Sequence, residues 1–447
     1  MAIDEERDSG EPNDRVSIRL GATEDVKTVE AYTFHSSILQ QPDAFTLTLS
    51  GGKGAAEVLN KYPPGPKGRC ALYIGKYRQF TGELDAPDAH GDANTTLVDL
   101  GGRSLMARLH DNDILGERSF NDATYEALFK TALEAVGQGH KLVEISNKAN
   151  VQVRSGSNVK AWKEPVTVDE VQLTASGVNN KFHSVVTAKM GESWLQFLTR
   201  HFKKVGLFPW CDANGNFVLS RPNGEQAPSF HFYRRRGAGS SQANVKSFSF
   251  KNDTTHRFSE VVIFCRNGGR KKGHNTKHGG FVDEEMVALG FDRVRVYRDV
   301  DVGSPEEAEF YARRQIAEIN RASWRLQYVI SGHSAPKIGS PKERAVVCPD
   351  MVARVDDDEL GIHQNLYIES VEYRNPPRTT VITMMRPQDL LFGENQAITG
   401  AQKAKAAAQA AEQKRIRQPI SFVRDQPNEK TALWRDVLSN IPSKPTG

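Results

Sequence analysis

The stretch that decides the fold runs from Ala71 to Asp111 and reads ALYIGKYRQFTGELDAPDAHGDANTTLVDLGGRSLMARLHD. Short runs of β-branched and aromatic residues alternate there with Gly, Pro, Asn and Asp, which is typical of antiparallel strands joined by turns. We expect a strand over 71–74, a tight turn at Gly75-Lys76 and a strand that runs through Phe80 to Leu84. A polar loop follows, and then a strand over 95–100 that continues to Ser104. The stretch carries no catalytic motif, so it predicts a β-meander that builds a sheet.

Length and composition set the outer bounds. A chain of 447 residues is too long for one ordinary core, so about two to four domains are expected. The mean hydropathy of −0.54 indicates extensive polar surface, and no apolar run approaches the roughly 20 residues of a membrane helix. We therefore predict no membrane insertion. The net charge of +4 is small for this length and gives no indication of specific nucleic-acid binding.

The chain begins with an acidic arm and a first β-region. Residues 1–15 contain six acids and two arginines without apolar periodicity, which favours a flexible arm. A secretory signal would be basic and then apolar, so we expect assembly in a cytoplasm. Period-two alternation starts at Val16–Leu20 and returns at 45–50. With the meander, these strands predict a β-domain over 16–113.

The next region, 114–222, changes period and predicts a small α+β domain. Apolar residues at helical spacing indicate a helix over 123–136, with Gly137 available as its stop. A second helix is expected over 192–204. The pair Asn214-Gly215 then indicates a β-hairpin turn.

Strand patterns return in a second β-rich region, 223–395. A helix interrupts it from Ser304 to Arg321, with Pro305 in the first turn. The expected strands are 230–233, 245–251, 260–265, 324–331, 351–355, 366–373 and 379–385. The whole pattern predicts an α+β, mainly β fold in which two β-rich regions flank a small α+β domain.

The last region, 396–447, has the composition of a tail. Residues 397–417 are rich in Ala, Gln, Lys and Glu, which favours an exposed helix without a face to bury. One short amphipathic piece follows over 431–438. Its apolar face would contain Leu433, Trp434, Val437 and Leu438. This face is too small for a core, so we expect it to dock on a partner or to fold back on its own chain.

Candidates for chemistry are few, and we predict no catalytic, cofactor-binding or metal-binding residues. The motifs GxSxG, HExxH and Walker A are absent, as is GxGxxG between a strand and a helix. The four cysteines lie far apart and are expected to be packed thiols. The acidic run Asp356–Glu359 has oxygen ligands suited to a cation but not the spacing of an EF-hand, so we interpret it as an exposed turn. The histidines show no ligand spacing and are expected to be surface or structurally satisfied residues.

The pronounced charge feature is basic. Arg234-Arg235-Arg236 is followed by a glycine-rich loop over 266–274 that contains Arg270, Lys271 and Lys272. Such a loop could neutralise phosphates, but no aromatic residues are interleaved to stack on bases. We expect a solvated or protein-contacting loop.

Several segments, taken in order, resemble one protein family. They are Ile74-Gly75, then Phe80-Thr81-Gly82-Glu83-Leu84-Asp85, then Gly102-Arg103-Ser104, then Gly191–Leu198 with Gly206-Leu207 and Asp212–Leu219, then Ser247–Phe250 to Val261–Ile263, and finally Leu360–Ile362 to Glu369–Tyr373. This order, over 16–391, is similar to that of Mu-type phage baseplate hub proteins, within the wider group of late-control and VgrG-like hubs of contractile injection systems.

The resemblance implies a function that needs no active site. It implies two tube-like antiparallel β-barrel domains per chain, and a homotrimer whose six barrels match a six-fold tail tube on one side and a three-fold spike on the other. The implied partners are the central spike protein, the tail tube or tube-initiator protein, the tape-measure protein and the baseplate wedge proteins, within the virion. Two alternatives stay open: a peptidoglycan-degrading tail enzyme, and a carbohydrate- or nucleic-acid-binding β-module.

Overall fold

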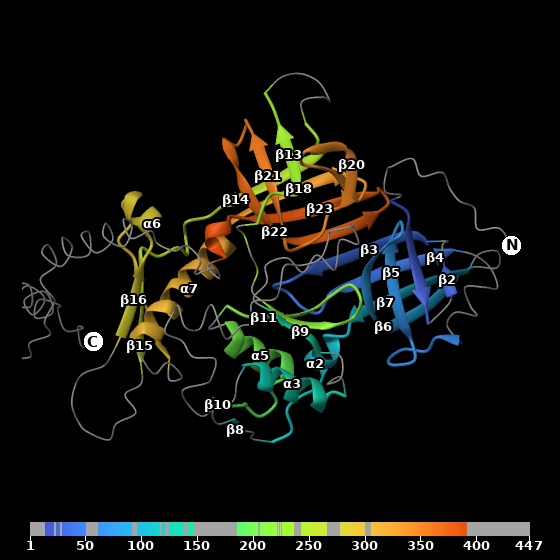
Figure 1. Cartoon of the computed structure of the whole chain (residues 1–447), viewed down its shortest axis with the longest axis horizontal. Helices are drawn as coiled ribbons and strands as arrows, with labels where there is room; N and C mark the ends of the chain where they lie inside the picture. The colour runs from blue at the N-terminus through green and yellow to red at the C-terminus, as the bar shows by residue number, and fades with distance from the viewer. Residues whose placement is uncertain are drawn as a thin grey trace, which may run out of the picture. The chain divides into compact units, whose positions relative to one another are not determined.

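The structure is a computed structural model (Figure 1). It describes residues 14–21, 24–26, 29–50, 61–91, 96–116, 119–120, 125–137, 142–146, 186–203, 206–220, 222, 224, 226–236, 243–265, 278–299 and 305–390. All of these belong to the first of the two compact units, 1–394, into which the chain divides. Among them, no helix is both long enough and apolar enough to cross a membrane.

One large sheet of fifteen strands dominates the described chain. Its first seven strands are β1 Val16–Leu20, β2 Glu24–Val26, β3 Val29–Ser37, β4 Ala44–Ser50, β5 Arg69–Ile74, β6 Tyr77–Gly91 and β7 Thr96–Ser104. The other eight are β13 Phe230–Arg234, β14 Ser247–Asn252, β18 Trp324–Ser331, β19 Ser334–Lys337, β20 Ser340–Val346, β21 Met351–Asp357, β22 Ile362–Asn375 and β23 Thr379–Met385. The expectation of a mainly β fold is confirmed.

Alternation along the strands places one face of the sheet in the core. In β1, Val16, Ile18 and Leu20 are buried while Ser17 and Arg19 are half-exposed. The same period of two holds in β18, where Trp324, Leu326, Tyr328 and Ile330 are buried. These residues belong to one apolar core that receives side chains from both the early and the late strands.

Two expectations for the first seven strands need correction. The polar stretch after Leu84 is not a loop, because β6 continues to Gly91 and pairs with β7 beyond a β-bulge between Leu84 and Ala86. In addition, β2 and β3 were not expected. In β3, the alternate residues Tyr32, Phe34 and Ser36 are buried. Few of the inward-facing residues are aliphatic, so a search for hydrophobic alternation does not detect this strand.

A small α+β region follows the first seven strands. It contains α2 Ala107–Asp111, β8 Ser119–Phe120, α3 Tyr125–Ala135, β9 Leu142–Ser146, β10 Val186–Thr187, α5 Trp194–Phe202, β11 Phe208–Cys211 and β12 Phe217–Ser220. Ser193 begins α5 through a capping box with Gln196. As expected, β11 and β12 form a hairpin that turns at Asn214-Gly215, where the φ of Gly215 is +84°. The hairpin contacts the large sheet, because the Thr81 hydroxyl donates to the Ala213 carbonyl at 2.6 Å.

A second small sheet is inserted between β14 and β18. We call residues 253–323 the inserted module. It contains β15 Glu260–Cys265, β16 His278–Val282, α6 Glu284–Ala288, β17 Val294–Asp299 and α7 Pro305–Ser323. The strand order is β16-β15-β17, and α7 lies along β15 and β16 (Figure 1). A short 3-10 helix, η5 Pro387–Asp389, follows β23.

Candidate functional site

The two halves of the large sheet are joined by β3 and β22. Six residue pairs, from Ser370 opposite Ser37 to Asn375 opposite Tyr32, form this antiparallel ladder. The first half of β22 pairs with β21 instead, up to Ile368. The register shifts at Glu369, so β22 leaves β21 and passes to β3 while β23 follows its other edge. A single strand therefore belongs to both halves, although more than 300 residues separate the partners.

Aromatic rings fill the core under this ladder. Phe34 of β3 stacks on Tyr373 of β22 with ring centroids 5.5 Å apart, and its edge meets Phe80 of β6 at 5.5 Å. Phe45 of β4 packs on Phe80 in turn at 5.2 Å. Aromatic pairs in these geometries contribute about 1 kcal/mol each beyond burial. The junction is therefore packed as a core and not as a contact between separate domains.

A buried chain of hydrogen bonds also crosses the junction. His333 is fully buried; its Nε2 lies 2.5 Å from the Tyr32 hydroxyl and its Nδ1 lies 2.9 Å from the Thr380 hydroxyl. Since Thr380 donates its hydrogen to the Gly332 carbonyl at 2.8 Å, it accepts from Nδ1–H, and Nε2 accepts from Tyr32. The Asp14 carboxylate accepts from the His333 backbone N–H at 2.7 Å. Asp14, which we placed in the flexible arm, is thus bound to the second half of the sheet.

Burial determines the protonation states of His333 and Tyr32. It lowers the pKa of His333 to about 4 and raises the pKa of Tyr32 to about 12, with smaller effects from Asp14 and Arg378. The histidine is therefore neutral at physiological pH, as the hydrogen-bond chain requires.

Eight strands of the sheet form one antiparallel run, in the order β6-β7-β4-β3-β22-β23-β18-β14. At one end, β14 pairs with β18 alone among the described strands. At the other end, the outer part of β6, 86–91, pairs with β7 alone, because β5 stops opposite Glu83. The outer part of β6 and most of β14 are exposed. The run therefore has two edges whose outer backbone groups are not in a ladder with any described strand.

The two edges expose side chains of opposite charge. The outer part of β6 exposes Asp88, whereas Asp85, just before it, pairs with Arg103 at 2.6 Å. On β14, Lys251 is exposed, and the ring of the exposed Phe248 lies 3.7 Å from the guanidinium of Arg234, which pairs with Asp357 and Glu359. A chain with a negative side chain at one edge and a positive side chain at the other is suited to contact between copies.

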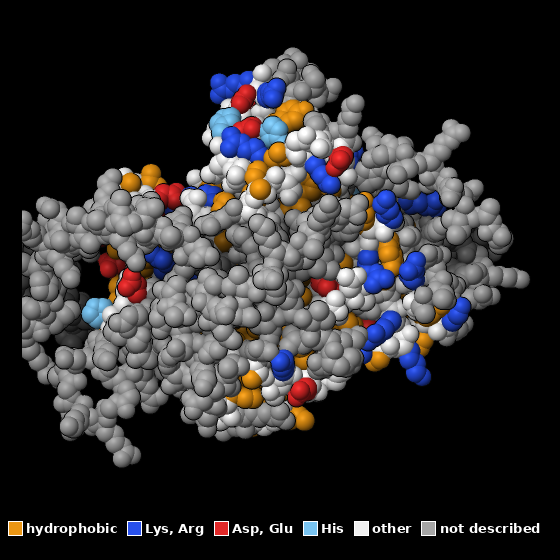
Figure 2. Space-filling model, in the orientation of Figure 1, with side chains coloured by type: hydrophobic (Ala, Val, Ile, Leu, Met, Phe, Trp, Pro, Cys, Tyr) orange, Lys and Arg blue, Asp and Glu red, His pale blue; other side chains and the backbone are white. Residues whose placement is uncertain are grey.

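The acidic run Asp356–Glu359 is a correction to the sequence analysis. Asp358 and Glu359 do lie at a turn, but Asp357 is fully buried in β21. It accepts from the Tyr328 hydroxyl at 2.6 Å and pairs with Arg234 of β13, directly opposite, at 3.0 Å. Burial of a carboxylate requires such partners. Basic, acidic and histidine side chains gather at this end of β13 and β21 on the face shown in Figure 2.

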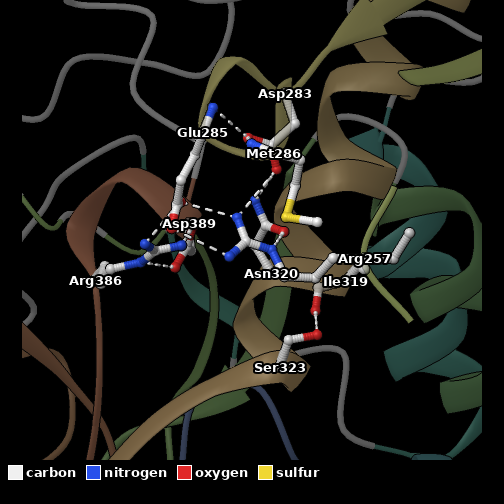
Figure 3. Close-up of polar contacts among 9 residues, drawn as sticks. All are labelled: Arg257, Asp283, Glu285, Met286, Ile319, Asn320, Ser323, Arg386 and Asp389. Atoms are coloured by element: carbon white, nitrogen blue, oxygen red, sulfur yellow. Dashed lines mark hydrogen bonds and ion pairs between the residues drawn. The ribbon is translucent and has the colours of Figure 1, made fainter. Parts of the chain in front are cut away.

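A second buried polar cluster ties the inserted module to the end of β23 (Figure 3). Arg257, 1% exposed, donates to Asn320 of α7 at 2.8 Å, to Asp283 at 3.2 Å and to Glu285 at 2.8 Å. Glu285 of α6 also pairs with Arg386 at 2.9 Å, and Arg386 pairs with Asp389 at 2.8 Å. Glu285 thus bridges the module's arginine and the arginine that follows β23.

The charges and the burial in this cluster explain the pKa shifts of its acidic side chains. The Arg257 guanidinium holds the pKa of Glu285 below its usual range. Burial raises the pKa of Asp389, against the opposing effect of Arg386. With two arginines and three acids, the charges nearly balance, so the cluster acts as a structural clamp.

The residues expected to bind partners lie outside the described chain. These are Leu433, Trp434, Val437 and Leu438 of the tail and Arg270, Lys271 and Lys272 of the basic loop. Both groups stay predictions. Cys70, Cys211 and Cys348 are buried thiols, and burial raises the pKa of Cys70. Within the described residues, no three His, Cys, Asp or Glu side chains are placed to hold a metal ion.

Comparison with solved structures identifies the fold. The chain is similar to the 43 kDa tail protein of prophage MuSo2 from Shewanella oneidensis, with a TM-score of 0.61 and 18% identity, over 84% of this chain and 99% of that one. It is equally similar to a tail protein from Neisseria meningitidis, with a TM-score of 0.59 and 19% identity, over 83% and 96% of the two chains. The chain has the fold of Mu-type phage tail proteins.

The expected resemblance to the Mu-type hub family is thus confirmed at the level of the fold. A type VI secretion system component from E. coli is also similar, with a TM-score of 0.45 and 10% identity, over 83% of this chain and 76% of that one. No family model matches the sequence, and no curated protein matches it. The similarity therefore lies in the fold of a tail protein, while the sequence has diverged.

Proposed function

We propose that this chain is a baseplate hub subunit of a contractile phage tail or a related injection system. Three copies would form a ring that joins the six-fold tail tube to the three-fold central spike. The observation that carries the proposal is the β3–β22 ladder. It places two β-rich regions side by side in one sheet, so that three chains present six such regions around an axis.

The free edges supply a way to close the ring. Neighbours alternate in direction along the eight-strand run, so β6 and β14 point in opposite directions. If copies follow one another head to tail, β14 of one copy meets β6 of the next in the antiparallel sense. Three copies then close a continuous sheet without a free edge. The exposed Asp88 at the β6 edge and the exposed Lys251 at the β14 edge favour this order over contact between like edges.

The remaining partners follow from the same role. A ring in the virion would contact the tail tube or tube-initiator protein and the tape-measure protein on one side, the spike on the other, and wedge proteins around its rim. We further propose that the tail segment with Leu433 and Trp434 and the basic loop with Arg270–Lys272 make such contacts. The mechanism is structural and requires no catalytic group, and no described site favours the hydrolase or the carbohydrate- or nucleic-acid-binding alternative.

The mass in solution tests the proposal first. The monomer is 49.7 kDa, and light scattering of the purified chain, alone and with the candidate spike protein, should give about three times that mass in at least one condition. A monomer that persists in both conditions contradicts the hub assignment.

Hydrogen exchange of the same samples tests the edges. We expect the backbone amides of 86–91 and 247–252 to exchange more slowly in the trimer than in the diluted monomer. The matched control is β20, the strand at the other end of the sheet order, whose exchange should stay the same. Equal protection of all three strands in the two states would exclude closure through β6 and β14.

A further inference from the structure

The inserted module exposes an unusual share of apolar surface. Eight large apolar side chains are exposed among the described residues, and four of them lie in this module. They are Val287, Leu289, Val294 and Val296, each between 51% and 59% exposed. Val294 and Val296 lie on β17, and Val287 and Leu289 lie on α6 and at its end. A contiguous exposed apolar surface marks an interaction site more often than scattered single residues do.

The two faces of the module's sheet differ in their contacts. On one face, Val261 and Ile263 of β15 are fully buried against Ala308, Ala312 and Ile316 of α7. Strand pairing fixes what lies on the opposite face. It carries Glu260, Val262 and Phe264 from β15, His278, Gly280 and Val282 from β16, and Val294, Val296 and Arg298 from β17. Every one of these residues is partly or fully exposed.

Apolar residues concentrate toward one side of this open face. Gly280 lies opposite Val262 and adds no side chain, which leaves Val262 accessible beside Val296. The outer edge of β17 pairs with no described strand, so backbone groups are available next to the two valines. A three-stranded sheet with one apolar face uncovered is not a self-sufficient core.

We infer that this open face of β16-β15-β17 packs on a second copy of this chain, the neighbour in the ring. This inference rests on the proposed hub function. The module is inserted between β14 and β18, the last two strands at the basic edge, and its two ends are held together where the Asp253 N–H donates to the Ser323 carbonyl at 2.9 Å. A neighbour that docks on β14 therefore lies next to the module as well.

Charge identifies the part of the neighbour that fits. Arg298 on the open face and Arg293 just before β17 are exposed, so the apolar surface has a basic rim along β17, with Glu260 on the neighbouring strand. The β6 edge that would meet β14 exposes Asp88. The Glu285–Arg386 pair ties the module to its own β23 end. Apolar contact surrounded by complementary charge is typical of specific interfaces.

Photo-crosslinking tests this contact directly. Val296→benzoylphenylalanine, irradiated in the trimer, should give a crosslinked dimer whose partner peptide maps to the first half of the sheet, near β6. The control is Ile338→benzoylphenylalanine, which is also exposed, at 43%, in the turn between β19 and β20. Crosslinks from position 296 only within one chain, or only to the spike protein, would overturn the inference.

A second variant measures the contribution of the face. Val294→Glu with Val296→Glu should raise the dissociation constant of the trimer at least tenfold, whereas Ile338→Glu should leave it unchanged. Both valines are exposed, so thermal unfolding of the monomer should not change. An unchanged dissociation constant in a chain that still forms trimers overturns the inference and leaves the hub function standing. A wild-type chain that never exceeds the monomer mass contradicts both.

Discussion

His333 shows how one side chain joins distant parts of the sequence. It receives a hydrogen bond from Tyr32 of β3 and donates one to Thr380 of β23, while its backbone is held by Asp14. Each ring nitrogen has one partner in the neutral form. Protonation would put a hydrogen on Nε2, which then could no longer accept from Tyr32. The histidine thus makes the junction of the two halves sensitive to acid.

We predict a loss of stability between pH 6.5 and pH 4 that depends on His333. The unfolded histidine takes up a proton near pH 6.5, whereas the folded one does so near pH 4. Stability is therefore fully present above pH 6.5 and falls as the pH drops toward 4, by roughly 3 kcal/mol from this group. Denaturant unfolding at a series of pH values should show this fall.

The matched variant is His333→Gln, whose amide can accept from Tyr32 and donate to Thr380 without titrating. It should reduce the fall in unfolding free energy between pH 6.5 and pH 4, and His256→Gln, at an exposed site, should not. An identical pH profile for wild type and His333→Gln would show that another group causes the acid sensitivity.

At the scale of single elements, sequence periodicity predicted the helices, strands and turns whose conformation depends on their own residues. The alternation at Val16–Leu20, the helix expected over 192–204 and the Asn214-Gly215 turn are local, and each appears where we expected it. Among the strands that the sequence analysis missed, β3, β16 and β17 are formed through pairing with neighbouring strands. In β17 the two valines are exposed, so their alternation does not mark a buried face of the strand.

The attachment of the inserted module gives the prediction at this scale. Arg257→Met removes the charge that Asp283 and Glu285 share, which leaves the buried Asp283 without its cation while Glu285 keeps Arg386. We expect the free energy of unfolding to fall by about 3 kcal/mol, with faster hydrogen exchange in α6. Arg374→Met is the control, because its ion pair with Glu372 at 2.6 Å is exposed and should cost no more than about 1 kcal/mol. A similar loss of unfolding free energy in both variants would mean that burial of the clamp contributes nothing to stability.

The arrangement of the whole molecule depends on contacts that no local pattern encodes. Tyr32 and Asn375 are opposite each other in the sheet, yet nothing in either segment specifies the other. The buried Asp357 was misread for the same reason, since its partner Arg234 lies 123 residues away. The resemblance to hub proteins predicted the fold class, but it did not predict the pairing of β3 with β22. The partner-binding residues of the tail and of the basic loop stay predictions.

The tail gives a prediction for the assembled particle. Deletion of 414–447 should leave the trimer intact, because the large sheet and its two edges lie entirely within 14–390. If the amphipathic face docks on a partner, the deleted chain should enter particles poorly, and Trp434→Ser with Leu438→Ser should reproduce that defect. Arg435→Ser, off the apolar face by helical spacing, is the control. Immunoblots of purified particles would measure incorporation. Normal incorporation of the truncated chain would remove the docking role, whereas loss of the trimer would place the tail in the ring itself.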